Sequence, residues 1–474
     1  MEKSSVQKKL EGIVGSEYVS SGDTILQTYS AAYLSGKGAR SDVTPDFVVI
    51  ASTVEEVQNI VRLANRYSIP IIPIGSSTSM YSETTPFEGG IMLNFGRMNH
   101  IDVDLNDRIV TFEPGVNWGQ AYRELTPLGY QVYYPSLSGA ISVLGTTTQR
   151  GAPAPIRVGY YCEETLGLEV VTPTGELVRT GSGAQTGAKQ YARYVLGPDL
   201  TGIFLGAQGT LGIVVKQTMP LHKIPEAREG VEGIFKDFKS TVKPAQRMMD
   251  DNFFPERVTV NKAEEGRWEM YVQMAGNKER VKFDKEIAKR ILTEEGGDQV
   301  KDGPVQPALY PIGAALFRWL PPTADPEKFD YKSPFSVPGK GMPTPPGGGL
   351  IGPYLWIEYS KSGDLIDAEE KIFEKHGIPS KLSGVSLEGR WGVYGQVGVC
   401  SYFDASNPQQ GKKSHDILIE CVEKGIEMGA VIYRLDPLSA TVVLPKLGEY
   451  YQLLKRLKHV LDPNRIMTPG SMGL

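Results

Sequence analysis

Short apolar runs separated by loops of small residues dominate the first half of the chain. Residues 47–50 (Phe-Val-Val-Ile) form a run whose length and β-branched content predict a strand. Apolar residues then recur at helical spacing from 57 to 64, after Thr53 and Glu56 in capping-box spacing. A second apolar run, 70–74, follows this helix. The pattern predicts a β-α-β unit near the start of the fold.

The pattern changes twice farther along the chain. Near residue 222 glycine becomes rarer and charged residues more frequent, which indicates a second domain. Residues 333–353 are rich in proline and glycine and form a loop too long for a simple connection. We therefore expect an N-terminal domain over 1–222, a second domain over 223–429 and a C-terminal segment over 430–474. Within them the pattern predicts strands at 90–95, 108–113 and 430–434, a hairpin at 168–179, and helices at 118–128, 283–292, 415–428 and 453–461.

Three loops of small residues lie next to predicted strands. The first is Gly75-Ser76-Ser77-Thr78-Ser79-Met80, directly after the 70–74 run; the second spans 142–151 and the third spans 206–215. Glycine permits close approach of a ligand to the backbone, and successive backbone N–H groups with Ser and Thr hydroxyls bind anions. The first loop contains neither a G-K-[ST] phosphate motif nor a G-x-G-x-x-G fingerprint. It predicts either a phosphate cradle built without lysine or an ordinary strand-to-loop turn.

Composition excludes several classes of protein. The 474-residue chain is 40% apolar and 22% charged, as globular proteins are, and its net charge of −5 does not favour nucleic acid. It has no apolar run of about 18 residues, so we expect no membrane span. Its N-terminus lacks the apolar core of a signal peptide, so we expect a cytoplasmic protein. The three cysteines and five histidines are scattered, which predicts neither a disulfide framework nor a metal site.

Several motifs recur through most of the chain, densest over 45–220 and 430–474. They are Ser52-Thr53-Val54-Glu55-Glu56-Val57, Pro73-Ile74-Gly75 with Tyr81, Phe112-Glu113-Pro114-Gly115-Val116, Ser142-Val143-Leu144-Gly145 with Arg150-Gly151, Gly167-Leu168-Glu169-Val170-Val171, Gly209-Thr210-Leu211-Gly212-Ile213-Val214, Tyr433-Arg434, and Leu461-Asp462-Pro463-Asn464 with Pro469-Gly470. Together they resemble the vanillyl-alcohol oxidase / 4-cresol dehydrogenase (p-cresol methylhydroxylase) family of flavoproteins. The resemblance implies an α+β fold: a two-subdomain FAD-binding PCMH-type domain, an α/β cap domain with a large antiparallel sheet, and a C-terminal segment that returns to the FAD domain.

The resemblance also implies FAD as the cofactor, held by the three loops and their neighbours. Tyr354, on a strand predicted at 352–357, falls near the position where family members often bond FAD covalently, and it is the candidate for such a link. The other interpretation of Tyr354 is a packed strand tyrosine. The implied FAD-binding residues are Pro73, Ile74, Gly75, Ser76, Ser77, Thr78, Ser79, Met80, Pro135, Ser136, Leu137, Gly139, Val143, Leu144, Gly145, Thr148, Arg150, Gly151, Gly209, Gly212, Ile213, Val214 and Tyr354.

The catalytic set that the resemblance implies is Tyr81, Tyr433 and Arg434. In the family these positions polarise a phenolic oxygen. A phenol has a pKa of ~10, and two hydroxyl donors with a guanidinium stabilise its phenolate. The phenolate then favours loss of a hydride from the para-benzylic carbon to flavin N5, and water attacks the resulting quinone methide. Without the resemblance, a tyrosine after a turn and a Tyr-Arg pair on a strand are typical of packing and surface positions.

Two positions depart from the family, and alternatives stay open. Ser471 stands where related enzymes have a basic residue, and Ser136 stands where the oxidase branch has an aspartate. One alternative is an FAD-dependent D-2-hydroxy-acid (lactate or glycolate) dehydrogenase, whose carboxylate substrate would pair with Arg390 or Arg434. Another is an FAD-carrying electron-transfer subunit of a larger complex. We expect a small aromatic substrate, a cytochrome or other protein as electron acceptor, and a homodimer or higher homo-oligomer.

Overall fold

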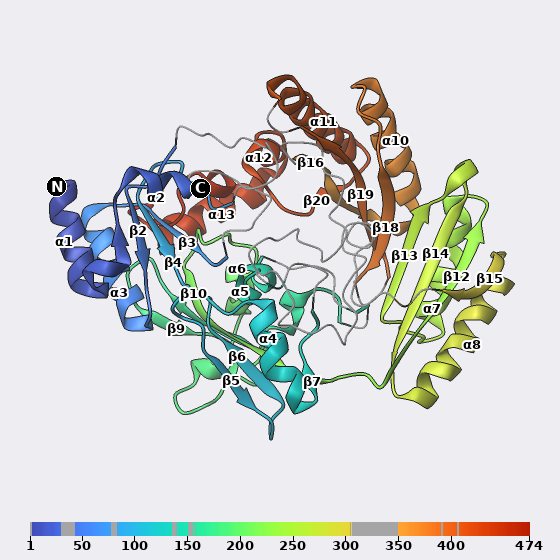
Figure 1. Ribbon diagram of the computed structural model, residues 1–474, viewed down its shortest axis with the longest axis horizontal. Helices are drawn as coiled ribbons and strands as arrows, with labels where there is room; N and C mark the ends of the chain where they lie inside the picture. The colour runs from blue at the N-terminus through green and yellow to red at the C-terminus, as the bar shows by residue number, and fades with distance from the viewer. Residues whose placement is uncertain are drawn as a thin grey trace.

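The protein consists of two bodies that face each other (Figure 1). One holds the N-terminal strands and helices together with the C-terminal helix, and the other is a broad sheet covered by helices. The computed structural model describes residues 2–29, 43–76, 83–134, 139, 141–149, 155–156, 158–303, 305, 349–389, 392–404 and 407–474.

The first sheet carries the β-α-β unit that the sequence predicts. Its strands lie in the order β1 (Val19–Ser20), β2 (Phe47–Ile50), β4 (Ile91–Asn94) and β3 (Ile71–Ile74), and β2 and β3 both run parallel to β4. The helix α3 (Val54–Tyr67) connects β2 to β3 and buries its apolar stripe. Because β3 is at the edge of this sheet, it tolerates a proline in its middle.

Thr53 caps α3, as its spacing predicts. Its hydroxyl accepts a hydrogen bond from the Glu56 backbone N–H at 3.1 Å. The Glu56 carboxylate accepts from the backbone N–H and the hydroxyl of Ser52, at 2.7 and 2.9 Å, rather than from Thr53. The reciprocal bond of the capping box is therefore shifted by one residue. Two helices precede this unit in the chain, α1 (Lys3–Val14) and α2 (Asp23–Thr28).

The second sheet is antiparallel. Its strands lie in the order β5 (Ile101–Asp104), β6 (Ile109–Phe112), β10 (Ile213–Pro220), β8 (Gly167–Val171) and β9 (Leu177–Arg179). The predicted hairpin is confirmed as β8 and β9, whereas β5 was missed because half of its residues are aspartates. The helices α4 (Trp118–Leu125), α5 (Val143–Thr147) and α6 (Leu200–Phe204) and the short strands β7 (Tyr130–Gln131) and β11 (His222–Lys223) complete this half.

The cap is an antiparallel sheet with helices on its outer face (Figure 1). Its strand order is β15 (Asp298–Gly303), β12 (Ala227–Phe235), β14 (Trp268–Gly276), β13 (Arg257–Lys262), β18 (Leu382–Glu388), β19 (Tyr394–Phe403), β17 (Tyr354–Glu358) and β20 (Val431–Ile432), and β16 (Gly349–Ile351) also pairs with β19. The helices are α7 (Val242–Asp250), α8 (Lys278–Glu294), α10 (Ser362–Lys375) and α11 (Pro408–Glu427).

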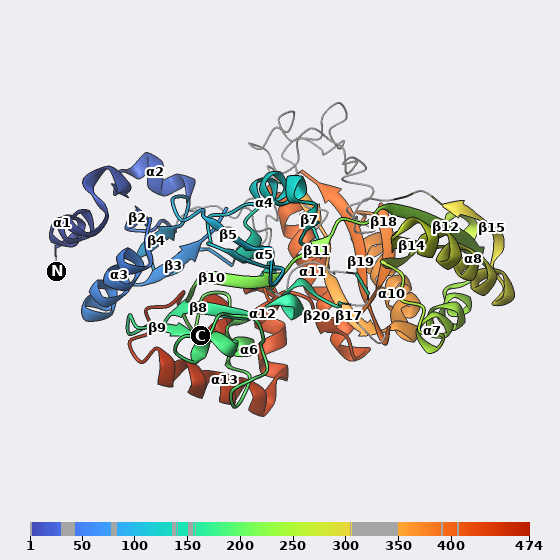
Figure 2. The same cartoon turned by 90° about the horizontal axis from the view of Figure 1, so that it is seen from below.

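The C-terminal segment begins in the cap and ends in the N-terminal half. β20 pairs with β17, so the crossing lies after residue 432 and not before residue 430. The helices α12 (Pro437–Val443) and α13 (Gly448–Leu461) then lead back, and Figure 2 shows α13 beside α6 and β8. The tail continues along β3: Ile71 N–H donates to Ile466 O at 2.6 Å, and Thr468 N–H donates to Ile71 O at 2.9 Å.

A buried ion pair fixes this tail. The Lys458 ammonium donates to an Asp462 carboxylate oxygen at 2.5 Å and to the carbonyls of Thr210 and Met467 at 2.8 Å each. Asp462 accepts in turn from the backbone N–H groups of Ile466 and Met467. Burial lowers the pKa of Lys458, and the neighbouring Asp462 opposes that change. The pair therefore joins the tail to the third small-residue loop.

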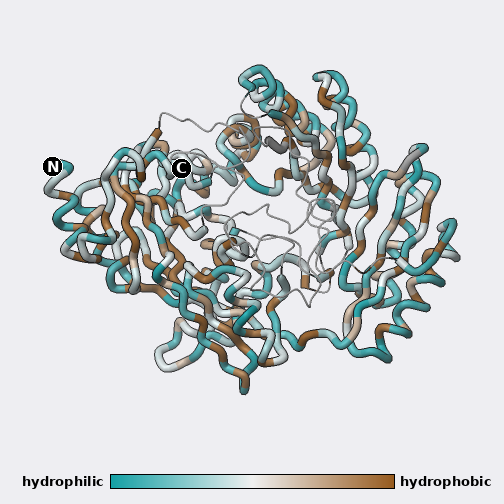
Figure 3. Tube along the Cα trace, in the orientation of Figure 1, coloured by the Kyte–Doolittle hydropathy of each residue, from teal (hydrophilic) through white to brown (hydrophobic). Residues whose placement is uncertain are grey.

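Apolar residues follow the strands and the inner sides of the helices, and polar residues cover the outer helices (Figure 3). Among the described residues, no helix combines the length and the apolarity needed to cross a membrane.

We expect Lys458→Met to lower the free energy of unfolding by ~3–5 kcal/mol, because it leaves the Asp462 carboxylate buried without its counter-ion. Arg456→Met, on the exposed side of the same helix, is the control and should change it by less than ~0.5 kcal/mol. Urea unfolding followed by fluorescence measures both. Equal stability of the two variants would contradict a structural role for the pair.

Candidate active site

The first two small-residue loops meet at the end of β3. The Ser142 backbone N–H donates to the Ser76 hydroxyl at 3.0 Å. A Cβ placed on Gly75 would lie 2.7 Å from the Ser142 Cβ, closer than real side chains approach. Gly75 is therefore required for the contact between the loops.

The second loop rests on the motif Glu113-Pro114-Gly115-Val116. The Ser142 hydroxyl donates to Pro114 O at 2.9 Å and accepts from Gly145 N–H at 3.1 Å, so Ser142 caps α5. Val143 N–H donates to Val116 O at 2.9 Å. A Cβ on Gly115 would lie 2.1 Å from the Phe95 carbonyl oxygen. This motif therefore supports the loop from below, a role that the sequence does not indicate.

The third loop closes the arrangement from the other side. Gly206 N–H donates to Thr148 O at 2.6 Å and so ties the third loop to the second. Gly209 has a φ of 74°, and a Cβ there would lie 2.7 Å from Pro73 Cγ and 3.0 Å from Thr468 Oγ1. Gly209 thus packs against β3 and the tail, and Gly212, Ile213 and Val214 follow where β10 begins.

The described loop residues fit the pyrophosphate of a dinucleotide. Gly145 is exposed, and among the described residues a Cβ there would meet only Ser142, at an ordinary contact of 3.4 Å. Backbone N–H groups and the hydroxyls of these loops are suitable donors for phosphate oxygens. The described members of the predicted set here are Pro73, Ile74, Gly75, Ser76, Gly139, Val143, Leu144, Gly145 and Thr148. The predicted residues Ser77, Thr78, Ser79, Met80, Tyr81, Pro135, Ser136, Leu137, Arg150 and Gly151 lie outside the described residues.

An aromatic cluster lies where the cap faces the N-terminal half. Tyr433, just after β20, is 5.5 Å from Trp356 between ring centroids, and Trp356 is 5.0 Å from Tyr160. Tyr354 and Tyr394 extend the cluster, and Tyr433 N–H donates to Tyr354 O at 2.9 Å. Tyr160, Trp356 and Tyr394 were not predicted. The alternation of aromatic residues 354 and 356 on β17 is the local pattern that could have indicated two of the cluster's members.

A pair of opposite charges adjoins this cluster. Arg434 Nη1 lies 3.7 Å from Glu83 Oε1, and their side chains are 14% and 6% exposed. The Arg434 guanidinium carbon is 5.4 Å from the centroid of the Tyr433 ring. Burial raises the pKa of Tyr433, and the charge of Arg434 opposes the rise. Tyr433 and Arg434 are adjacent in the chain, and Glu83 joins them without any signal in the sequence.

Glu388, at the end of β18, is a further titratable group beside the cluster. It is buried, and burial raises the pKa of its carboxyl well above the ordinary value, against hydrogen bonds from Ser386 and Tyr160 and the charge of Arg257. Its neutral form is therefore favoured beside Tyr433.

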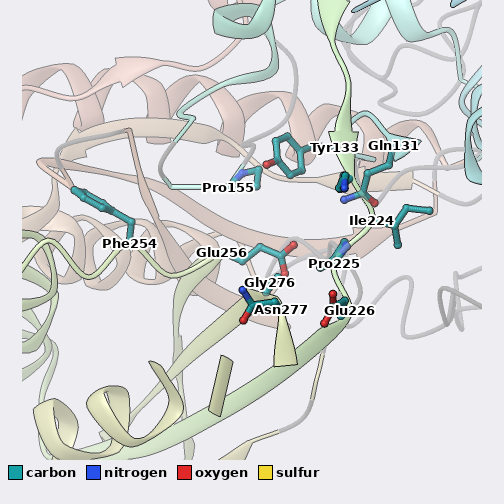
Figure 4. Close-up of a pocket in the computed structure, with 12 residues that line it drawn as sticks. Gln131, Tyr133, Pro155, Ile224, Pro225, Glu226, Phe254, Glu256, Gly276 and Asn277 are labelled. Atoms are coloured by element: carbon teal, nitrogen blue, oxygen red, sulfur yellow. The ribbon is translucent and has the colours of Figure 1, made fainter. Parts of the chain in front are cut away.

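A separate surface pocket lies at the junction where β11 leads into the cap (Figure 4). Gln131 and Tyr133 line one side, and Glu256 and Asn277 line the other. The Glu256 carboxylate already accepts from Gln273 Nε2 at 2.7 Å. This pocket contains none of the predicted site residues.

Comparison with known proteins identifies the N-terminal half. Residues 45–181 match the family described as FAD binding domain. The chain contains an FAD-binding domain. Its relatives are named for different reactions. A mitochondrial D-lactate dehydrogenase (cytochrome) of Arabidopsis thaliana is 25% identical, and the match covers 95% of this chain and 78% of that protein. The 4-cresol dehydrogenase flavoprotein subunit of Pseudomonas putida is 23% identical, and the match covers 91% of this chain and 88% of that protein.

Solved structures establish the fold of this flavoprotein. The crystal structure of p-cresol methylhydroxylase with substrate bound superposes with a TM-score of 0.82 at 21% identity, covering 99% of this chain and 96% of that one. A 4-ethylphenol oxidase from Gulosibacter chungangensis superposes with a TM-score of 0.77 at 19% identity, covering 99% and 97%. The predicted α+β architecture, an FAD domain with an antiparallel cap, is confirmed.

The two loop glycines allow a test of the cradle. We expect Gly145→Val to abolish FAD retention while the FAD-free protein keeps its stability, because a Cβ there meets no described residue closer than 3.4 Å. Gly75→Val should lower both FAD retention and the stability of the FAD-free protein, because a Cβ at Gly75 collides with Ser142. The flavin-to-protein absorbance ratio and the urea midpoint of the FAD-free protein measure the two effects. Full flavin occupancy in Gly145→Val would show that this loop faces no ligand.

Proposed function

We propose that this FAD-dependent oxidoreductase oxidises a para-substituted phenol, of the 4-cresol, 4-alkylphenol or 4-hydroxybenzyl alcohol type. The observation that carries the proposal is the placement of Tyr433 and Arg434, buried against an aromatic cluster between the cap and the FAD-binding half. Aromatic walls suit a planar phenol ring. The shared fold with p-cresol methylhydroxylase supports the same choice.

The residues of this chain would activate the phenol through its oxygen. Arg434 is charged at every accessible pH, so it stabilises the phenolate, and Tyr433 can donate a hydrogen bond to the same oxygen. Negative charge on the oxygen raises the electron density of the ring, and this favours release of a hydride from the para-benzylic carbon. FAD, when bound, supplies the hydride acceptor. Water then adds to the quinone methide that the substrate has become.

A second candidate is oxidation of a D-2-hydroxy acid. It is favoured by relatives that span nearly the whole chain, the D-lactate dehydrogenase above and glycolate oxidase subunit GlcD of Bacillus subtilis, which is 24% identical over 90% of this chain. Arg434 could pair with a carboxylate, whereas Arg390 lies outside the described residues. The part of the chain that the structure describes holds no group of three or more metal-ligating side chains.

Ser471 bears on the third possibility, an electron-transfer subunit. Its hydroxyl donates to Gln208 Oε1 at 2.7 Å, and Gln208 Nε2 donates to Leu435 O at 3.1 Å, next to Arg434. Ser471 therefore supports the backbone that carries Arg434, which favours a retained substrate site. A cytochrome or other protein as electron acceptor, a homodimer and a cytoplasmic location complete the proposal.

Arg434→Ala should slow flavin reduction by 4-cresol by about 10²–10³-fold, because it removes the charge that stabilises the phenolate. Tyr433→Phe should slow it less, since one neutral hydrogen bond contributes ~0.5–1.5 kcal/mol. Stopped-flow flavin reduction measures both, with flavin content as the control for folding.

The same experiment with D-lactate separates the two substrate classes. Reduction by 4-cresol and not by D-lactate is the expected result for the parent protein. Reduction by D-lactate alone would replace the phenol proposal with the hydroxy-acid one.

Covalent attachment of FAD, where it exists, should be through Tyr354. The half-buried Tyr354 lies on β17, and its hydroxyl accepts from the Cys400 thiol at 3.7 Å. After acid denaturation, flavin should stay on the parent chain and on Cys400→Ser, and it should be released from Tyr354→Phe. Flavin that leaves the parent chain would show that FAD is held without a bond, and flavin kept by Tyr354→Phe but lost from Cys400→Ser would assign the link to the cysteine.

A further inference from the structure

Glu83 and Arg434 come from the two halves of the protein and meet at the candidate substrate site. Glu83 follows the first small-residue loop, and Arg434 follows β20 of the cap. Both side chains are largely buried, and 3.7 Å separates Arg434 Nη1 from Glu83 Oε1. That distance exceeds the ~2.7–2.9 Å of a direct charge-assisted hydrogen bond. An oxygen atom placed beside the pair can therefore lie within hydrogen-bond reach of both groups.

The pair fixes the charge that the site can hold. One guanidinium is balanced by one carboxylate. A phenolate bound at Arg434 would be a second anion beside that guanidinium, and two buried anions at one site force one of them to take a proton. Tyr433 is no acceptor for that proton, since burial raises its pKa and keeps it as the neutral phenol. Glu388 cannot accept the proton either, because burial raises its pKa and already favours its protonated form.

We propose that Glu83 is a catalytic residue that accepts the phenolic proton when the substrate binds. The inference rests on the phenol oxidation proposed above. The phenolic O–H bond breaks and a Glu83 O–H bond forms, and Arg434 exchanges its carboxylate partner for the phenolate. The hydride leaves with the electron pair of the benzylic C–H bond. Water then adds hydroxide to the benzylic carbon and its proton to the phenolic oxygen, so the product departs as a neutral phenol. Glu83 releases the proton that it accepted to solvent and is again ionised.

This arrangement also selects the substrate class. A neutral phenol brings its own proton, so the charge of the site stays constant through binding. A hydroxy acid at neutral pH arrives as a carboxylate and has no such proton to transfer. The Glu83–Arg434 pair therefore disfavours hydroxy acids, although the arginine alone would attract them.

The test uses 4-nitrophenol, which lacks a benzylic C–H bond and changes its absorption when it ionises. It is mixed with the FAD-containing protein in weakly buffered solution below the pKa of the probe, with a pH indicator present. The expected result is a bound probe that absorbs as the phenolate while no proton appears in solution. Release of one proton per bound probe, or a bound probe that stays un-ionised, would overturn the role of Glu83.

The Glu83→Gln variant gives the matched comparison. Because glutamine cannot take the proton, its bound probe should be ionised with release of one proton per probe, and its affinity for the anionic probe should rise. Glu88→Gln, at an exposed acid on the same segment, should behave as the parent does. If Glu83→Gln fails to retain FAD, the measurement on the parent protein decides alone. Failure of the parent to bind any phenol would instead remove the proposed function, and this role with it.

Discussion

The buried Lys458–Asp462 ion pair is the constraint on which the arrangement of the site depends. Its hydrogen bonds reach the third loop through Thr210 O and the tail through Met467 O. The tail in turn extends the first sheet along β3, whose end carries the first loop. The first loop, the third loop and the C-terminal tail are thus held together at the end of β3. A buried pair of this kind adds little net stability compared with an apolar core, but losing one partner is costly, so it specifies one arrangement.

A second pair of opposite charges, Arg434 and Glu83, lies at the interface between the cap and the FAD-binding half. The cap supplies Arg434 and most of the aromatic cluster, while the FAD-binding half supplies Glu83 and Tyr160. Neither half alone contains a complete site. The backbone bond from Tyr433 to Tyr354 holds the residue before Arg434 against β17, so the cap sheet determines where the cation lies. The position of the cap therefore determines how Arg434 and Glu83 meet at the candidate site.

The sequence predicts features that depend on neighbours along the chain. The β2–α3–β3 unit, the Thr53 cap and the β8–β9 hairpin follow from apolar spacing and turn residues, and the structure confirms them. Features that depend on distant segments were missed or displaced. Position 115 must be glycine because the carbonyl of Phe95 leaves no room for a Cβ there. β20 belongs to the cap because it pairs with β17. Glu83 carries no local pattern at all, since its significance arises only from Arg434.

The fold does not decide between the chemistries of its relatives. Proteins named for D-lactate and for 4-cresol match nearly the whole chain at similar identity. What distinguishes the two substrates physically is what each brings to a buried cation. A carboxylate requires a cation that no other group has neutralised, whereas a phenol carries a proton that a neighbouring carboxylate can accept. In this protein Glu83 lies beside Arg434, and Arg434 adjoins the aromatic cluster through the ring of Tyr433. On the proposed function, the charges at the end of β20 would select the substrate class, and the architecture around them brings those charges together.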